Sequence, residues 1–222
     1  MGQLTVTPFA PSDYPRILEA AKLDTPWIDD RLAHGRAYAA NGPSYTIWAE
    51  GEIACTLGLV IPWPGRAAAW AVWGPAGFAH PAGVHRLTVQ YLRRLIRQHQ
   101  LARLDADVMS EFVGGRLWVE HLGFRAEGPP LEFYGPQGET MQHYVWIHPK
   151  AAQMREARAR GRATILEPVR RPDGSIMPAI AGGYGMEILA IAAIAATVVS
   201  AGVSAYASYE QGQQQKKAFK YN

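Results

Sequence analysis

The stretch that decides the fold is FAHPAGVHRLTVQYLRRLIRQ, residues Phe78–Gln98. Its first part contains Pro81 and Gly83 and predicts a loop. Apolar residues then recur at helical spacing and predict an amphipathic helix: Val84, Leu87, Tyr91, Leu92, Leu95 and Ile96. The first backbone N–H groups of a helix have no partner within it and lie at the positive end of its dipole. A loop that runs into such a helix is therefore a candidate anion-binding site.

The segments on either side of this stretch predict a sheet covered by helices. On the amino-terminal side, LTVTPF predicts a strand, and two helices are predicted by PSDYPRILEAAKL and DTPWIDDRLAHGRAYAANG. Thr25 and Pro26 are expected to start the second helix, and Asn41-Gly42 to end it. SYTIWAEGEIACTLGLVIPWPGRAAAWAVWG contains three predicted strands separated by turn residues. ARLDADVM, the helix EFVGGRLWVEHLGF, GFRAEGP and HYVWIH complete the order β-α-α-β-β-β-α-β-α-β-β. This order indicates an α+β fold.

Two blocks of the sequence resemble the GNAT family of N-acetyltransferases. Gly115–Gly128, GRLWVEHLGFRAEG, is similar to the family's last helix and following strand. His80–Val108 is similar to its acetyl-CoA segment in the lengths of loop, helix, turn and strand. The resemblance covers about residues 3–148 and implies a GNAT-like mixed sheet flanked by helices. It also implies that the start of the helix in Phe78–Gln98 faces the pyrophosphate of acetyl-CoA.

The loop departs from the pattern Arg/Gln-x-x-Gly-x-Gly/Ala that is usual in this family. The three fixed positions are occupied here by His80, Gly83 and His85, and Val84 lies between the last two. Pro81 removes one backbone donor. The side chain of His85 would stand where the pyrophosphate must approach the backbone. The resemblance therefore implies a degenerate acetyl-CoA loop made of His80, Gly83, Val84 and His85.

The family's proton-transfer groups are also missing from the matching positions. Val119 stands where the family has a tyrosine that can protonate the leaving thiolate. The segment AAAWAVW, residues 67–73, has no carboxylate to act as a general base. His80 and His85 can in principle act as bases, although a loop-capping and a surface histidine are the simpler interpretation. We therefore predict that the domain has no catalytic residue and is inactive, without a cofactor, and we keep acetyl-CoA as the alternative.

The other polar side chains predict neither a metal site nor a disulfide. Asp105 and Asp107 alternate along one strand and predict an exposed polar face. The single cysteine, Cys55, lies in an apolar run and is expected to be buried. Three further histidines lack the spacing of metal ligands: His121, His143 and His148. The tryptophans, Trp73 and Trp118 among them, are interpreted as core or interface residues.

The composition changes after residue 149, which we predict to be the end of the folded domain. Residues 150–186 predict a basic linker rich in Pro and Gly, whose seven Lys/Arg and three Asp/Glu give it a net charge of +4. Its first part, AAQMREARARGRA, is compatible with a short basic helix. Such a linker can make non-specific contacts with DNA.

Residues 187–222 predict one long apolar helix with a polar end rich in Gln and Lys. From Ile188 to Tyr209 there are 22 residues without a charge, which span about 33 Å as a helix. Small residues recur at every fourth position and predict an assembly helix that packs closely against another helix: Ala192, Ala196, Ser200, Ser204 and Ser208. This packing can occur in a homo-oligomer, against another protein or within a membrane.

The carboxyl-terminal sequence AATVVSAGVSAYASYEQGQQQKKAFKYN resembles the beginning of the internal virion proteins of podoviruses. The resemblance implies a phage virion structural protein, with an inactive GNAT-like docking domain attached to the assembly helix. It implies portal or internal core proteins as partners, and the host envelope membrane during genome ejection. The amino terminus shows no secretory signal, so synthesis in the host cytoplasm is expected. A membrane-tethered, acetyl-CoA-dependent N-acyltransferase is the alternative prediction.

Overall fold

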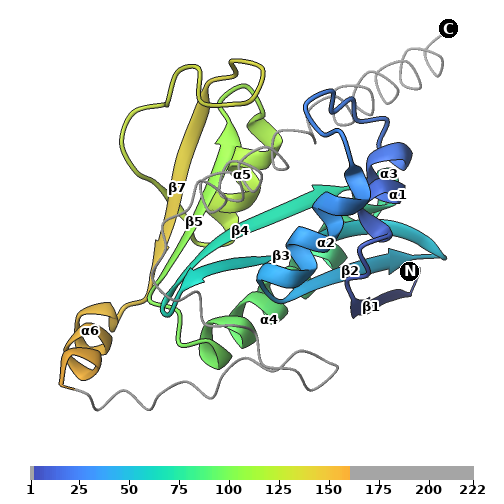
Figure 1. Cartoon of the computed structure of the whole chain (residues 1–222). Coiled ribbons are helices and arrows are strands. Elements are labelled where there is room, and N and C mark those ends of the chain that lie inside the picture. The colour runs from blue at the N-terminus through green and yellow to red at the C-terminus, as the bar shows by residue number, and fades with distance from the viewer. Residues whose placement is uncertain (1–2, 161–222) are drawn as a thin grey trace, which may run out of the picture.

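The computed structural model describes residues 3–160, which form a seven-stranded sheet with helices on both faces (Figure 1). The strands are β1 Leu4–Pro8, β2 Ser44–Ala49, β3 Glu52–Trp63, β4 Arg66–Trp73, β5 Arg103–Met109, β6 Arg125–Ala126 and β7 Met141–Ile147. The helices are α1 Asp13–Ala20, α2 Arg31–Asn41, α3 Pro75–Ala79, α4 Pro81–Gln98, α5 Val113–His121 and α6 Ala151–Ala159. The predicted α+β class and the order of the main elements are confirmed.

The sheet has the order β1-β2-β3-β4-β5-β7-β6, and β4 and β5 are its one parallel pair within residues 3–160. Parallel neighbours need a crossover connection, and α3 and α4 provide it. Figure 1 shows β4 and β5 leaving a common point and then separating, so that the sheet is split into two arms.

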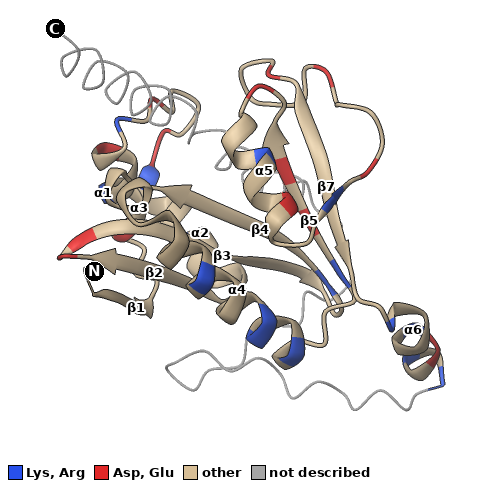
Figure 2. Cartoon of the chain, turned by 180° about the vertical axis from the view of Figure 1, so that it is seen from behind, with Lys and Arg blue, Asp and Glu red and all other residues tan. Residues whose placement is uncertain are grey.

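Helices α1 and α2 cover one face of the sheet, and α4 and α5 cover the other. On the first face, Tyr14 of α1 and Tyr38 of α2 are fully buried with Trp70 of β4. On the second face, Leu95 of α4 and Val119 of α5 are buried with residues of β3, β4, β5 and β7. Arg86, Arg93 and Arg97 lie on the exposed side of α4, where Figure 2 shows Lys and Arg in blue.

Helix α4 begins three residues earlier than the apolar spacing indicates. Pro81 and Gly83 lie in its first turn, although both were predicted to lie in a loop. Pro81 occupies the first helical position, where the missing N–H breaks no hydrogen bond and the fixed φ suits the helix. The residues before it form the short helix α3, so that His80 alone separates the two helices.

Helix α2 also begins away from its predicted cap. Thr25 and Pro26 were predicted to start it, but the helix begins at Arg31 with Asp30 as its N-cap. The Asp30 carboxylate accepts hydrogen bonds from the amides of Leu32 and Ala33, each 2.9 Å long. A carboxylate that accepts two first-turn amides is a stronger cap than a threonine hydroxyl placed before five further coil residues. The predicted end of the helix at Asn41 is confirmed.

The chain beyond β7 forms the predicted short basic helix, α6, before the described residues end. The Arg158 guanidinium donates to the carbonyl of Gln100 at 2.9 Å, so α6 contacts the domain. No helix within residues 3–160 is both long and apolar enough to cross a membrane. Most of the predicted linker and the whole predicted assembly helix, including Ala192, Ala196, Ser200, Ser204 and Ser208, lie outside the described residues.

Candidate functional site

The candidate site is the gap between the two parallel strands. β4 and β5 pair over three positions only: Arg66 with Arg103, Ala67 with Leu104 and Ala68 with Asp105. Beyond Ala68 the two strands continue without pairing to each other within the described residues. Backbone N–H and C=O groups at such facing strand edges require other partners. The divergence thus creates two facing edges that can pair with an extended ligand bearing amide groups.

A cavity of about 300 Å³ lies between the end of β4 and helix α5. Aromatic rings form much of its wall. Trp73 of β4 stacks on Phe78 of α3 at a centroid distance of 5.5 Å and meets Trp118 of α5 edge to face at 5.0 Å. Pro81, at the start of α4, lines the same cavity. His121 of α5 is the one titratable side chain among the lining residues.

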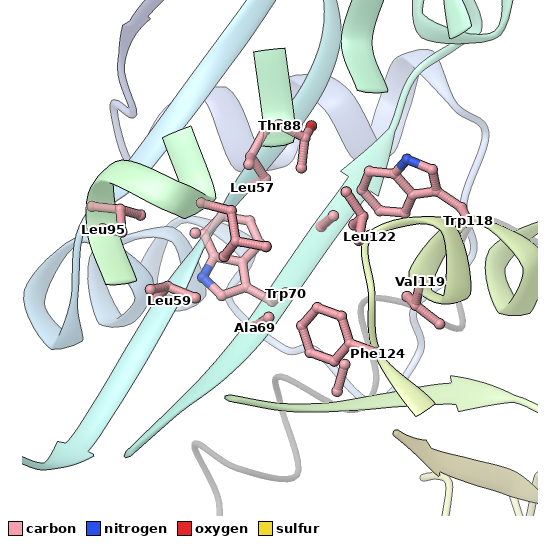
Figure 3. A pocket seen from close by; sticks show the side chains of 14 residues that line it. Leu57, Leu59, Ala69, Trp70, Thr88, Leu95, Trp118, Val119, Leu122 and Phe124 are labelled. Atoms are coloured by element: carbon pink, nitrogen blue, oxygen red, sulfur yellow. The ribbon is translucent and has the colours of Figure 1, made fainter. Parts of the chain in front are cut away.

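A second and smaller cavity, of about 50 Å³, lies deeper in the gap (Figure 3). Residues of β3, β4, β5, α4 and α5 line it, and nearly all of them are apolar. Ala69 of β4 and Ala106 of β5 are each the next residue after the last parallel pair, so this cavity lies where the strands begin to separate. Ala71 and Trp118 line both cavities, which therefore adjoin each other.

The predicted loop residues lie at the start of α4, beside the larger cavity. His80 is the N-cap residue, and its carbonyl accepts from the amides of Gly83 and Val84, each at 3.1 Å. Val84 is fully buried in the core. A Cβ added to Gly83 would lie 2.4 Å from a terminal methyl carbon of Leu4 in β1, so glycine permits close packing here. His85 is half-buried on the first turn.

This arrangement leaves few backbone donors for an anion. Pro81 has no N–H, and the amides of Gly83 and Val84 donate to the His80 carbonyl. Within the part of the chain that the structure describes, the Ala82 N–H is the first-turn donor of α4 that has no acceptor. The helix dipole still favours a negative group at this end. The first turn therefore provides a weak anion site.

A network of charged side chains occupies the opposite face of β5. The Asp105 carboxylate accepts from Arg66 at 2.6 Å and from Arg103 at 2.7 Å. Arg103 also forms an ion pair with Glu127. Asp105 is only 5% exposed, so the predicted exposed polar face is wrong. β7 and the arginines cover the carboxylate, which strand alternation alone did not indicate.

His143 of β7 joins the same network. Its Nδ1 contacts the Asp107 carboxylate at 2.6 Å, and its Nε2 lies 3.3 Å from Asp105. The hydrogen bonds to Asp105 and Asp107 raise the pKa of His143 to about 9, although burial opposes this. Burial alone would raise the pKa of Asp105, but hydrogen bonds from His143 and the two arginines lower it to about 2. In residues 3–160, no group of three or more His, Cys, Asp or Glu side chains has the arrangement of a metal site.

The fold was compared with known proteins. No protein-family model matches the chain, and no curated protein sequence matches it. The ribosomal-protein-S18-alanine N-acetyltransferase from Escherichia coli aligns with a TM-score of 0.53 and 14% identity, over 65% of this chain and 94% of that protein. A chimera of the spermidine N-acetyltransferase from Vibrio cholerae aligns with a TM-score of 0.53 and 14% identity, over 68% of this chain and 98% of the chimera.

A third structure, described as an acetyltransferase of the GNAT family from Desulfovibrio desulfuricans, aligns with a TM-score of 0.53 and 17% identity. It covers 65% of this chain and 99% of its own. The described domain has a GNAT-like acetyltransferase fold. The fold that was predicted from Gly115–Gly128 and His80–Val108 is thus confirmed. At these identities, the likeness shows the fold and not the activity.

The prediction of a phage virion structural protein is wrong. The GNAT-like fold is shared with N-acetyltransferases from bacteria, and none of the three structures named above is a virion protein. The resemblance of the carboxyl-terminal sequence to podovirus internal virion proteins therefore did not indicate the class of the protein. The roles in genome ejection, at the portal and in the host membrane depended on that resemblance and fall with it. The alternative prediction, an acyltransferase, fits these neighbours better.

Sequence reasoning missed the residues that form the cavities of the GNAT-like fold. Trp73 and Trp118 were interpreted as core or interface residues, and His121 as an isolated histidine. The sequence contained one signal for this wall, because Trp73 ends a predicted strand and Phe78 lies shortly before the candidate anion site. The contribution of α5 could not be found in this way, because it depends on the separation of β4 from β5.

Proposed function

We propose that the GNAT-like domain binds an acyl-CoA in the gap between β4 and β5 and transfers the acyl group to an amine. The observation that carries the proposal is the divergence of the two parallel strands above a cavity of about 300 Å³. The pantetheine arm of CoA is narrow and contains two amide groups. Such an arm matches an apolar gap that is bordered by unpaired strand edges.

Different residues of the site would hold different parts of CoA. Trp73, Phe78 and Trp118 would contact the apolar parts of the arm. The diphosphate would lie near the Ala82 N–H and the start of α4, with His80 and His85 beside it. Val84 and Gly83 would support the turn from behind, since one is buried and the other packs against β1.

In the reaction, the amine nitrogen attacks the carbonyl carbon of the thioester. A C–N bond forms, the C–S bond breaks, and the electron pair of that bond leaves on the CoA sulfur. The amine gives up a proton, and the thiolate takes one up to become CoA-SH. His121 is the titratable side chain in the wall of the larger cavity and is therefore the residue that we assign to protonate the thiolate.

The acceptor class is inferred from the named neighbours. One is described as an alanine N-acetyltransferase and another as a spermidine N-acetyltransferase, and both names specify transfer to nitrogen. An amine acceptor is the common chemistry. The predicted inactivity of this domain concerns the rate of the transfer. The weak anion site at the start of α4, and a valine at position 119 in place of a proton donor, both favour slow catalysis.

Isothermal titration of the full chain with CoA and acetyl-CoA tests the binding. We expect micromolar dissociation constants, and Trp73→Ala should weaken them at least tenfold because its ring joins both walls of the cavity. Trp63→Ala is the matched control, since Trp63 is 41% exposed and lies outside both cavities. Its affinity should equal that of wild type.

Release of CoA thiol in the presence of a panel of amines tests the transfer. Thiol release that depends on one class of amine would support the enzyme. Binding without release for every amine would favour a CoA-binding domain without catalysis. Absence of binding at millimolar CoA would contradict the proposed site.

A further inference from the structure

The placement of CoA proposed above does not use the smaller cavity, which requires an explanation of its own. Protein interiors are packed as densely as organic crystals, and voids larger than a water molecule are few. This cavity lies in the middle of the second-face core, among Leu59, Leu95, Val119 and Phe124. Such a void forfeits dispersion contacts on every wall that surrounds it. An apolar guest would restore those contacts.

The wall of the cavity favours an apolar guest over water. A buried water needs two to four polar partners, roughly. The Thr88 hydroxyl already donates to the carbonyl of Val84 at 2.9 Å. The indole of Trp70 packs on the opposite face against Tyr38, at a ring-centroid distance of 4.1 Å. The indole N–H groups of Trp70 and Trp118 are both buried and have no acceptor among the described residues, but only Trp118 belongs to the apolar cluster that surrounds the cavity.

The position of Trp118 connects the cavity to the proposed CoA site. Trp118 and Ala71 line both cavities and therefore form the boundary that a ligand extending from the larger cavity into the smaller one would cross. The buried N–H of Trp118 at this junction is a donor suited to a carbonyl oxygen. A thioester carbonyl at the junction would have the CoA arm on one side and the acyl chain on the other.

We infer that the smaller cavity binds the acyl chain, and that the donor is an acyl-CoA of about four to six carbons rather than acetyl-CoA. This inference rests on the proposed function. A single water requires roughly 10–15 Å³ of such space, and the cavity has about 50 Å³. It therefore holds roughly three to five groups of the size of a methylene, which together with the thioester carbonyl make an acyl chain of about four to six carbons. The small side chains of Ala69 in β4, labelled in Figure 3, and of Ala106 in β5 leave this space open.

Titration of the full chain with CoA, acetyl-CoA and hexanoyl-CoA tests the inference without a need for turnover. Each buried methylene should tighten binding about fourfold. Hexanoyl-CoA should therefore bind at least tenfold more tightly than acetyl-CoA. Equal affinities, or a preference for acetyl-CoA, would overturn the inference and leave the proposed function intact. Absence of binding for all three ligands would overturn both.

Ala69→Leu places a larger side chain in the cavity. We expect this variant to lose the preference for hexanoyl-CoA and to keep the affinity for CoA within about twofold. Thr88→Leu fills the cavity from α4, and it replaces Ala69→Leu if that variant fails to show cooperative thermal unfolding. Ala40→Leu is the matched control, because the same change lies on an exposed position of α2, and it should keep the preference. An equal loss of affinity for CoA and hexanoyl-CoA in Ala69→Leu would show that the cavity holds the pantetheine arm instead.

Discussion

Asp105 lies at the point where β4 and β5 part, and its carboxylate organises a network of charged side chains on the face of β5 opposite the cavities. Arg66, Arg103 and His143 surround its carboxylate. Because two carboxylates raise the pKa of His143 to about 9, this histidine is protonated at neutral pH. It is therefore a structural cation that fixes β7 beside β5 rather than a general base. Its ring is held in this network and does not line either cavity, so the proposed protonation of the thiolate stays assigned to His121, which lines the larger one.

The network should make stability depend on pH in the alkaline range. The pKa of His143 is raised from 6.5 to about 9 on folding, so its contribution is complete below pH 6.5 and is lost as the pH rises through 9. The free energy of unfolding should thus fall by roughly 2–3 kcal/mol between pH 6.5 and 9. Urea titrations of wild type and His143→Gln measure this. The difference between the two should shrink over that range.

His148→Gln is the control for this experiment, since its ring accepts from the Lys150 amide and belongs to no carboxylate pair within the described residues. Its pH dependence should parallel that of wild type. A His143→Gln variant with the same alkaline loss as wild type would show that the network does not control this transition.

Individual residues illustrate why the sequence predicted only part of the site. The alternation of Asp105 and Asp107 correctly indicates that both point to one face of β5. It contains no information about β7, whose His143 lies 36 positions after Asp107 in the chain. Gly83 was matched to an anion-binding glycine, yet its packing against Leu4 of β1 gives a sufficient reason for glycine. Contacts between distant segments decide both cases, and local patterns do not report them.

Among the elements, those with a strong apolar period were predicted and those defined by their neighbours were not. The spacing from Val84 to Ile96 identified α4, and Asn41-Gly42 identified the end of α2. Helix α3, with five residues, is too short for its period to be recognised. The parallel pairing of β4 with β5, and their separation after three pairs, follows from how α4 and α5 pack beneath them. The candidate site depends on this separation, so no cavity could be predicted from the sequence.

The start of α4 should limit the affinity for the diphosphate of CoA. Pro81→Ala adds an N–H at the first helical position without removing a hydrogen bond. A hydrogen bond to a charged group is worth about 1.5–3 kcal/mol when well placed, so we expect binding of CoA to tighten at least threefold. Pantetheine lacks the diphosphate, and its affinity should not increase. Isothermal titration with both ligands separates this effect from loss of the proline ring in the cavity wall.

Pro75→Ala is the matched control, because Pro75 begins α3 and does not line either cavity. The ratio of CoA to pantetheine affinity should remain at the wild-type value. If Pro81→Ala leaves this ratio unchanged as well, the diphosphate does not lie at the first turn of α4.

For the whole chain, the two ends of the sequence indicated different classes of protein, and the domain with a packed core was the better guide. The buried clusters use residues from most of the strands and helices between Phe9 and Tyr144. A pattern spread over so many contacts is specific to a fold, even at 14–17% identity. The podovirus resemblance depended on about thirty residues rich in Ala, Ser, Gly and Gln. Such composition recurs in unrelated helices, so its functional implication was weak.

The carboxyl-terminal segment stays a prediction and can be tested by truncation. Deletion of Met186–Asn222 should leave the unfolding midpoint and the CoA affinity unchanged, because the clusters and both cavities lie within residues 3–160.

The full chain should self-associate, since its 22 uncharged residues would otherwise expose aliphatic side chains that are each worth about 1.5–3 kcal/mol when buried. Sedimentation velocity distinguishes the two forms. Ser200→Trp should block close helix packing and reduce the association, whereas a full chain that is monomeric without detergent would contradict the predicted assembly helix.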